Sequence, residues 1–117
     1  MKIGFIGTGI MGKPMAQNLQ KAGHTLYFSE HYKKAPADLL GDNGIALANP
    51  AAVAQAADII ITMVPDTPQV EEVLFGENGV AEGLSAGKIV IDMSSISPIA
   101  TKAIAKRVNE TGADYLD

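Results

Sequence analysis

The segment that decides the fold is Gly7-Thr8-Gly9-Ile10-Met11-Gly12, which lies between an apolar run at 3–6 and a helix-like stretch at 13–22. The first glycine permits a sharp turn, and the second lets the backbone approach a pyrophosphate without a Cβ in the way. The third allows close contact between helix and strand, while the free N–H groups of the first helical turn face the anion. Pro14 fits that first turn, where a backbone N–H has no helical partner. The alternative is an ordinary glycine-rich turn, but the strand and the helix that the motif requires are both present.

Strand and helix signals alternate along the rest of the chain. Isoleucine- and valine-rich runs without alternation indicate parallel strands buried on both faces. A capping side chain followed by proline marks the starts of three later helices, at Asn49-Pro50, Thr67-Pro68 and Ser97-Pro98. Strands are expected at 2–7, 25–29, 44–47, 58–64, 88–93 and 114–117, with helices at 11–22 and, weakly, 35–40, and a long polar loop at 76–84.

This alternation predicts an α/β fold with a doubly wound parallel sheet of the Rossmann type. Right-handed crossovers and the glycine motif after the first strand give the strand order 3-2-1-4-5, with a sixth strand outermost if it forms. The loops at the carboxyl ends of the strands then border one crevice and should carry the function. At 117 residues the chain corresponds to one domain.

Composition excludes several classes of function. A net charge of −4 argues against binding to nucleic acid, which needs a basic surface. The absence of cysteine excludes disulfides and thiolate metal sites, and it is compatible with a cytoplasmic protein. No apolar run approaches the roughly 20 residues that span a bilayer, and the N-terminus leads directly into a strand instead of a cleavable signal. No His, Asp or Glu cluster has metal-ligand spacing, so no metal site is expected.

Glu30 follows the second strand, where a carboxylate would accept hydrogen bonds from the hydroxyls of the adenosine ribose. The same charge would repel a 2′-phosphate, which favours NAD as the cofactor. His31, Lys33 and Lys34 form a cationic stretch that would tolerate NADP, so NADP stays open. The alternative for Glu30 is a solvated surface glutamate.

Two other loops carry candidate cofactor contacts. The backbone at Val64 and Pro65 would cross the nicotinamide-side ribose, and Gln69 in the following helical turn could reach a hydroxyl; a simple helix-capping turn is compatible with this. The hydroxyls of Ser94 and Ser95 could meet the nicotinamide ribose or carboxamide, or a substrate carboxylate, and local backbone hydrogen bonding is the alternative for Ser94. Asp92, near the end of a buried strand, is interpreted as a group that orients the loop, not as an acid or base.

Three stretches resemble the β-hydroxyacid dehydrogenases, which include 3-hydroxyisobutyrate dehydrogenases and tartronate semialdehyde reductases. The stretch at 5–19 is similar to the N-terminal signature of the family, although Thr8 replaces the usual leucine. The stretches at 63–79 and 92–98 are especially similar to the tartronate semialdehyde reductases. The resemblance covers the whole chain.

The resemblance implies a role for each matched residue. Gly7, Thr8, Gly9, Ile10, Met11 and Gly12 would hold the pyrophosphate, and Glu30 the adenosine ribose. Val64, Pro65 and Gln69 would contact the middle of the cofactor and Ser95 its nicotinamide end. The reaction of the family would be reversible hydride transfer between NAD(H) and a small carboxylate-bearing aldehyde.

Other parts of the family pattern have no counterpart in this chain. The substrate segment, the catalytic lysine and the helical substrate domain are absent after Asp117, so residues 1–117 match an incomplete N-terminal cofactor domain. No catalytic residue is therefore expected here, and Lys102 and Lys106 are interpreted as a solvated helix face. The alternatives are a stand-alone nucleotide-binding module and an inactive truncated scaffold. An exposed edge of the sheet would favour homodimer formation.

Overall fold

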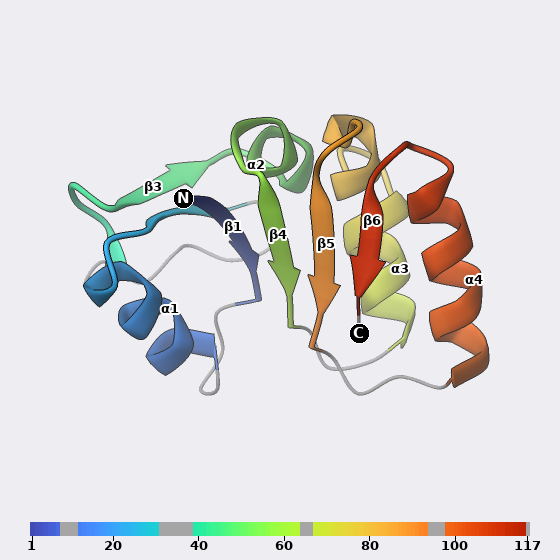
Figure 1. Cartoon of the computed structure of the whole chain (residues 1–117), viewed down its shortest axis with the longest axis horizontal. Helices are drawn as coiled ribbons and strands as arrows, with labels where there is room; N and C mark the ends of the chain where they lie inside the picture. The colour runs from blue at the N-terminus through green and yellow to red at the C-terminus, as the bar shows by residue number, and fades with distance from the viewer. Residues whose placement is uncertain (8–11, 31–38, 64–66, 94–97, 117) are drawn as a thin grey trace.

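The computed structural model describes residues 1–7, 12–30, 39–63, 67–93 and 98–116, and they build a parallel sheet with helices on both faces (Figure 1). The strand order is β3-β2-β1-β4-β5-β6, and every pair of neighbouring strands is parallel. The strands are β1 (Lys2–Ile6), β2 (Thr25–Ser29), β3 (Gly44–Leu47), β4 (Ile59–Thr62), β5 (Ile89–Asp92) and β6 (Asp114–Leu116). The predicted doubly wound sheet is therefore confirmed, including its sixth strand.

The helices are α1 (Gly12–Lys21), α2 (Pro50–Ala56), α3 (Thr67–Phe75) and α4 (Pro98–Asn109). The three helix starts expected at prolines are present, since α2 begins at Pro50, α3 at Thr67-Pro68 and α4 at Pro98. At the first of them, Asn49 Oδ1 accepts a hydrogen bond from the Ala52 N–H at 2.9 Å. Gly23 ends α1 with a φ of 95°, a left-handed conformation that favours glycine. The weak helix expected at 35–40 falls almost entirely outside the described residues.

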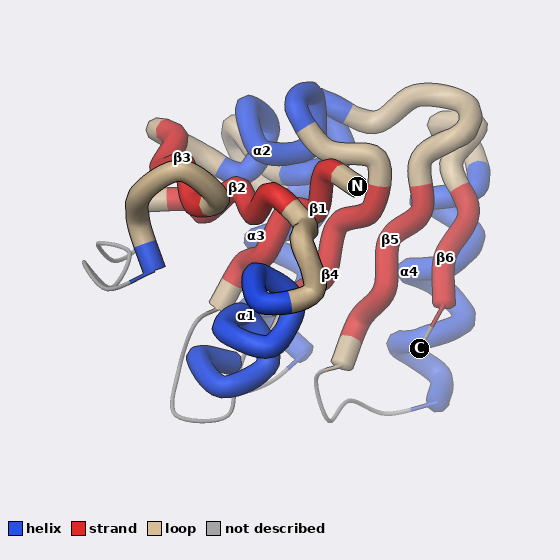
Figure 2. Tube along the Cα trace, turned by 60° about the vertical axis from the view of Figure 1, so that its left-hand side comes forward, coloured by secondary structure: helices blue, strands red, loops and turns tan. Residues whose placement is uncertain are grey.

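Two hydrophobic clusters lie on opposite faces of the sheet, because successive side chains of a strand point to opposite sides. On one face, Ile3 and Phe5 of β1 pack with Ala16 of α1. On the other face, Ile60 of β4 and Val90 of β5 pack under α2, α3 and α4. Figure 2 shows α1 on its own side of the strands, with α3 and α4 on the other.

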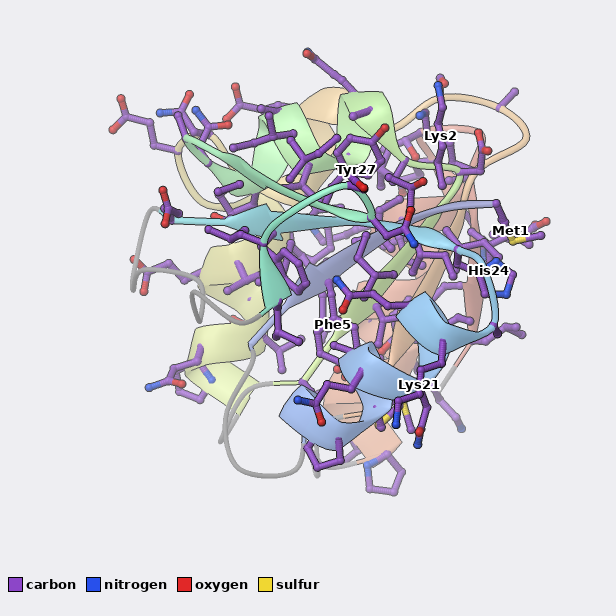
Figure 3. All side chains as sticks on the ribbon, turned by 90° about the vertical axis from the view of Figure 1, so that its left-hand side faces the viewer. Met1, Lys2, Phe5, Lys21, His24 and Tyr27 are labelled. Carbon is purple, nitrogen blue, oxygen red and sulfur yellow. The ribbon has the colours of Figure 1, made fainter. Side chains whose placement is uncertain are left out.

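The end-on view separates the two faces (Figure 3). Phe5 lies between the sheet and α1, and Tyr27 lies on the side of the other cluster. The sheet therefore has one helix over β1 and β2 on the first face and three helices on the second, within the described part of the chain.

Two sequence-based expectations were wrong in part. The stretch at 76–84 is not simply a polar loop, because a short 3₁₀ helix, η2 (Val80–Gly83), buries Val80 completely. Gly83 packs against α2 so closely that a Cβ would lie 2.3 Å from the Ala51 carbonyl oxygen. In β5, Ile89 and Ile91 are only half-buried, so this strand alternates where burial on both faces was expected.

Candidate functional site

The carboxyl ends of the strands lie together at one edge of the sheet, where the arrowheads of β1, β4 and β5 point the same way (Figure 1). The strand order reverses between β1 and β4: from β1 the chain adds β2 and β3 on one side, and from β4 it adds β5 and β6 on the other. Ligands of such sheets bind in the crevice outside these carboxyl ends, at the point where the strand order reverses. The geometry places the candidate site there.

Gly7 follows β1 at this point with a φ of 94°, a conformation that favours glycine because an L side chain is strained there. Five residues later Gly12 begins α1. The end of β1 and the N-terminus of the next helix in the chain thus lie at the reversal of strand order, where sheets of this kind accommodate a pyrophosphate. Thr8, Gly9, Ile10 and Met11 lie outside the described residues.

Glu30 leaves the end of β2, next to β1 in the sheet. Its backbone N–H donates to the Leu47 carbonyl oxygen of β3 at 2.9 Å, so the position of its backbone is held between two strands. Its side chain is exposed. The residue therefore stands at the same edge as Gly7, one strand farther from the reversal.

Gln69 is the third residue of α3 and is exposed in the first turn after β4. Val64, Pro65 and Ser95 lie outside the described residues, although the strands that lead into them are described. Met63 donates its N–H to the Ile6 carbonyl oxygen at 2.9 Å, and Met93 to the Thr62 carbonyl oxygen at 2.8 Å. These bonds continue the sheet one residue past β4 and β5, and so fix where the next two segments begin.

Asp92, which the sequence analysis interpreted as a loop-orienting group, belongs to a polar cluster whose other members the sequence analysis missed. The Thr62 hydroxyl donates to Asp92 Oδ1 at 2.9 Å, and the Tyr115 hydroxyl donates to Asp92 Oδ2 at 3.4 Å. Thr62 is fully buried and Asp92 is 2% exposed. A signal was present for two of the three, because Thr62 and Asp92 are each the last, polar residue of an otherwise apolar strand.

Residues at the amino ends of the strands lie far from this site. Asp58 is exposed before β4, and its N–H continues the sheet by donating to the Lys2 carbonyl oxygen at 2.9 Å. His24 lies near Met1 and Lys2 at the amino ends of β1 and β2 (Figure 3). Both positions agree with structural roles for Asp58 and His24. Among the residues that the structure describes, no three His, Asp or Glu side chains form a group that could hold a metal ion.

No helix in the described part of the chain is long and apolar enough to cross a membrane.

Known proteins share this sequence and this fold. The chain is 56% identical over all of its 117 residues to the 2-hydroxy-3-oxopropionate reductase of Escherichia coli (strain K12). It is 39% identical over 115 residues to the mitochondrial 3-hydroxyisobutyrate dehydrogenase of Bos taurus. It spans 40% of the length of the first relative and 34% of the second.

A crystal structure of a 3-hydroxyisobutyrate dehydrogenase from Salmonella typhimurium superposes with a TM-score of 0.86 at 28% sequence identity. The match covers 98% of this chain and 40% of that one. The six-stranded order and the helices on both faces are thus those of a dehydrogenase cofactor domain.

Residues 2–117 match the family described as the NAD binding domain of 6-phosphogluconate dehydrogenase. The relatives of this chain are β-hydroxyacid dehydrogenases, and the cofactor of the domain is a nicotinamide dinucleotide, as the glycine motif and the resemblance predicted. The chain belongs to this family of NAD-binding domains.

Proposed function

We propose that this chain is the cofactor-binding part of an oxidoreductase that transfers hydride between NAD(H) and a small hydroxyacid or semialdehyde. The tartronate semialdehyde/glycerate pair is the proposed substrate, because the 2-hydroxy-3-oxopropionate reductase relative is 56% identical across the chain. The observation that carries the proposal is the position of Gly7, which follows β1 in a left-handed conformation where the strand order reverses.

The cofactor would lie along the carboxyl edge of the sheet. The segment at 7–12 would hold the pyrophosphate with backbone N–H groups, and Glu30 would accept hydrogen bonds from the adenosine ribose. Val64, Pro65 and Gln69 would contact the nicotinamide-side ribose, and Ser95 the nicotinamide end. We propose NAD as the preferred cofactor because the exposed side chain of Glu30, at the end of β2, would meet a 2′-phosphate with a like charge.

The chain alone is expected to bind the cofactor without turnover. It spans 40% of the reductase relative, and no residue in it is proposed as the general acid that protonates the substrate carbonyl. Loss of a general acid typically lowers the rate by about 10²–10⁴. The purified chain should therefore show no ordinary rate of tartronate semialdehyde reduction with NADH.

The test is calorimetric titration of the chain with NADH and with NADPH. Gly7→Ala should weaken NADH binding at least about fivefold, because a Cβ at positive φ strains the turn that aims backbone at the pyrophosphate, and such strain costs about 1–2 kcal/mol. Gly87→Ala is the matched control, because Gly87 has a φ of 93° and open space around a Cβ. Gly87 lies in the turn before β5, at the opposite edge of the sheet.

The two glycine variants should lose similar stability, and only Gly7→Ala should lose affinity. Equal affinity in both variants and the parent would contradict the proposed pyrophosphate site. Rapid hydroxyacid oxidation by the chain alone would contradict the expected lack of turnover. Tight NADH binding without activity on any hydroxyacid would favour a stand-alone nucleotide-binding module.

We also propose that the chain forms a homodimer through the edge of β6. This strand pairs with β5 on one side, and Leu116 is 54% exposed. Edge strands with apolar exposure favour pairing with another chain.

A further inference from the structure

The buried cluster of Thr62, Asp92 and Tyr115 joins three neighbouring strands at the functional edge of the sheet. Thr62 and Asp92 are partners in the β4–β5 register, and Tyr115 pairs with Val90 on the next strand. All three side chains point to the face that α2, α3 and α4 cover, because Ile60 and Val90, two residues earlier on β4 and β5, belong to that cluster.

The hydrogen bonds of the cluster provide partners for both oxygens of the buried Asp92 side chain. Both Asp92 oxygens accept from hydroxyl groups, at 2.9 Å from Thr62 and 3.4 Å from Tyr115. A carboxylate only accepts hydrogen bonds, and a carboxyl group with 2% exposure must find partners inside the protein. A polar side chain at this depth needs its hydrogen-bond partners, and those partners are in turn held in place by it.

The position of the cluster connects it to the nicotinamide half of the site. Thr62 ends β4 and Asp92 ends β5, and each strand continues for one more residue before the segments at 64–66 and 94–97. These segments hold Val64, Pro65 and Ser95. The hydrogen bond between Thr62 and Asp92, the last paired residues of β4 and β5, sets the distance between the starts of these two segments. The affinity of a binding site depends on such preorganisation.

We propose that Asp92 is a positioning residue for the nicotinamide half of the cofactor site. It fixes the carboxyl ends of β4 and β5 relative to each other through Thr62, with Tyr115 holding its second oxygen. The inference rests on the proposed cofactor function, and it adds that the adenosine half of the site, at β1 and β2, does not depend on this cluster.

The test compares NADH with ADP, which carries the adenosine and the pyrophosphate but neither the second ribose nor the nicotinamide. Asp92→Asn replaces one of the two acceptor oxygens with an amide nitrogen at nearly constant shape, and Thr62→Val removes the hydrogen bond that Thr62 donates. Each should weaken NADH binding about fivefold, the equivalent of one ordinary hydrogen bond, and leave ADP binding unchanged. A purely structural role would weaken both ligands together or neither.

Two further variants serve as controls. Thr62→Ser retains the hydroxyl and should restore NADH affinity relative to Thr62→Val. Asp58→Asn changes an exposed side chain at the other end of β4 and should alter the affinity for neither NADH nor ADP. If Asp92→Asn does not fold, the comparison of Thr62→Val with Thr62→Ser decides the question in the same terms.

The outcomes separate the two claims. If the parent chain binds neither NADH nor ADP, the proposed function fails and this inference fails with it. If the parent binds both ligands but the variants change both equally or change neither, the proposed function stands and the role of Asp92 is overturned.

Discussion

At the residue scale, the chemistry of the site depends on a few side chains whose backbone the sheet holds in place. Glu30 is an example, because its N–H bond to Leu47 anchors the residue at the end of β2 while the carboxylate remains exposed. An exposed carboxylate on a fixed backbone can accept hydrogen bonds from ribose hydroxyls and discriminate by charge against a phosphate.

Glu30→Gln should therefore improve NADPH binding relative to NADH by about tenfold, because it removes a repulsion between like charges a few ångströms apart. Calorimetric titrations of both cofactors at constant ionic strength measure the ratio of dissociation constants. Glu110→Gln is the control, since Glu110 is an exposed glutamate just after α4, at the opposite end of that helix from the carboxyl edge. An unchanged ratio in Glu30→Gln would remove Glu30 from cofactor selection.

Sequence reasoning reached some residues and missed others for physical reasons. The conformation of Gly7 was predicted because the motif requires a turn that only glycine adopts without strain. Thr62 was missed because its partner Asp92 is 30 residues away in the chain, and only the strand register brings the two together. The hydrogen bond from the Gln20 side chain to the Leu39 carbonyl oxygen, at 2.7 Å, was missed because the two residues are 19 positions apart and meet only in the tertiary structure.

At the element scale, the helices that were clearest in the sequence carry their own start signals. Asn49 caps α2 through its side chain, and Pro50 occupies the first turn. The 3₁₀ helix η2 carries no such signal, because its single buried side chain, Val80, forms no period that could be detected. Its burial comes from contact with α2 and is a property of the tertiary structure.

Asn49→Ala should lower the free energy of unfolding by about 1 kcal/mol, because the Ala52 N–H loses its acceptor at the helix start. Chemical denaturation followed by circular dichroism measures the change. Asn18→Ala, at an exposed position inside α1, should cost nothing and provides the control. A loss of the same size in both variants would mean that the cap does not stabilise α2.

At the scale of the whole molecule, the described helices cover the two faces of the sheet unequally. α2, α3 and α4 pack over one face, and α1 packs over β1 and β2 on the other. Met93 is 47% exposed and Leu116 is 54% exposed, at the ends of β5 and β6. Apolar exposure at the β6 end of the sheet is the basis for the proposed homodimer.

Leu116→Lys should shift the chain toward the monomer in sedimentation equilibrium at high protein concentration, because a charge at the edge opposes pairing. Ile45→Lys is the matched control, since Ile45 is 39% exposed on β3, the strand at the other edge. A parent chain that remains monomeric, or an equal effect of both variants, would contradict a dimer through β6.

The central claim is that a nicotinamide dinucleotide binds along the carboxyl edge of the sheet, between β2 and β5. The most direct measurement is an NMR titration of the ¹⁵N-labelled chain with NADH, in which each backbone amide reports on its own surroundings. The claim predicts shifts at Gly7, Gly12, Glu30 and Gln69, and none at Asp58, Gly87 and Gly112 near the opposite edge. Shifts confined to the opposite edge, or no shifts at saturating NADH from a folded sample, would contradict it.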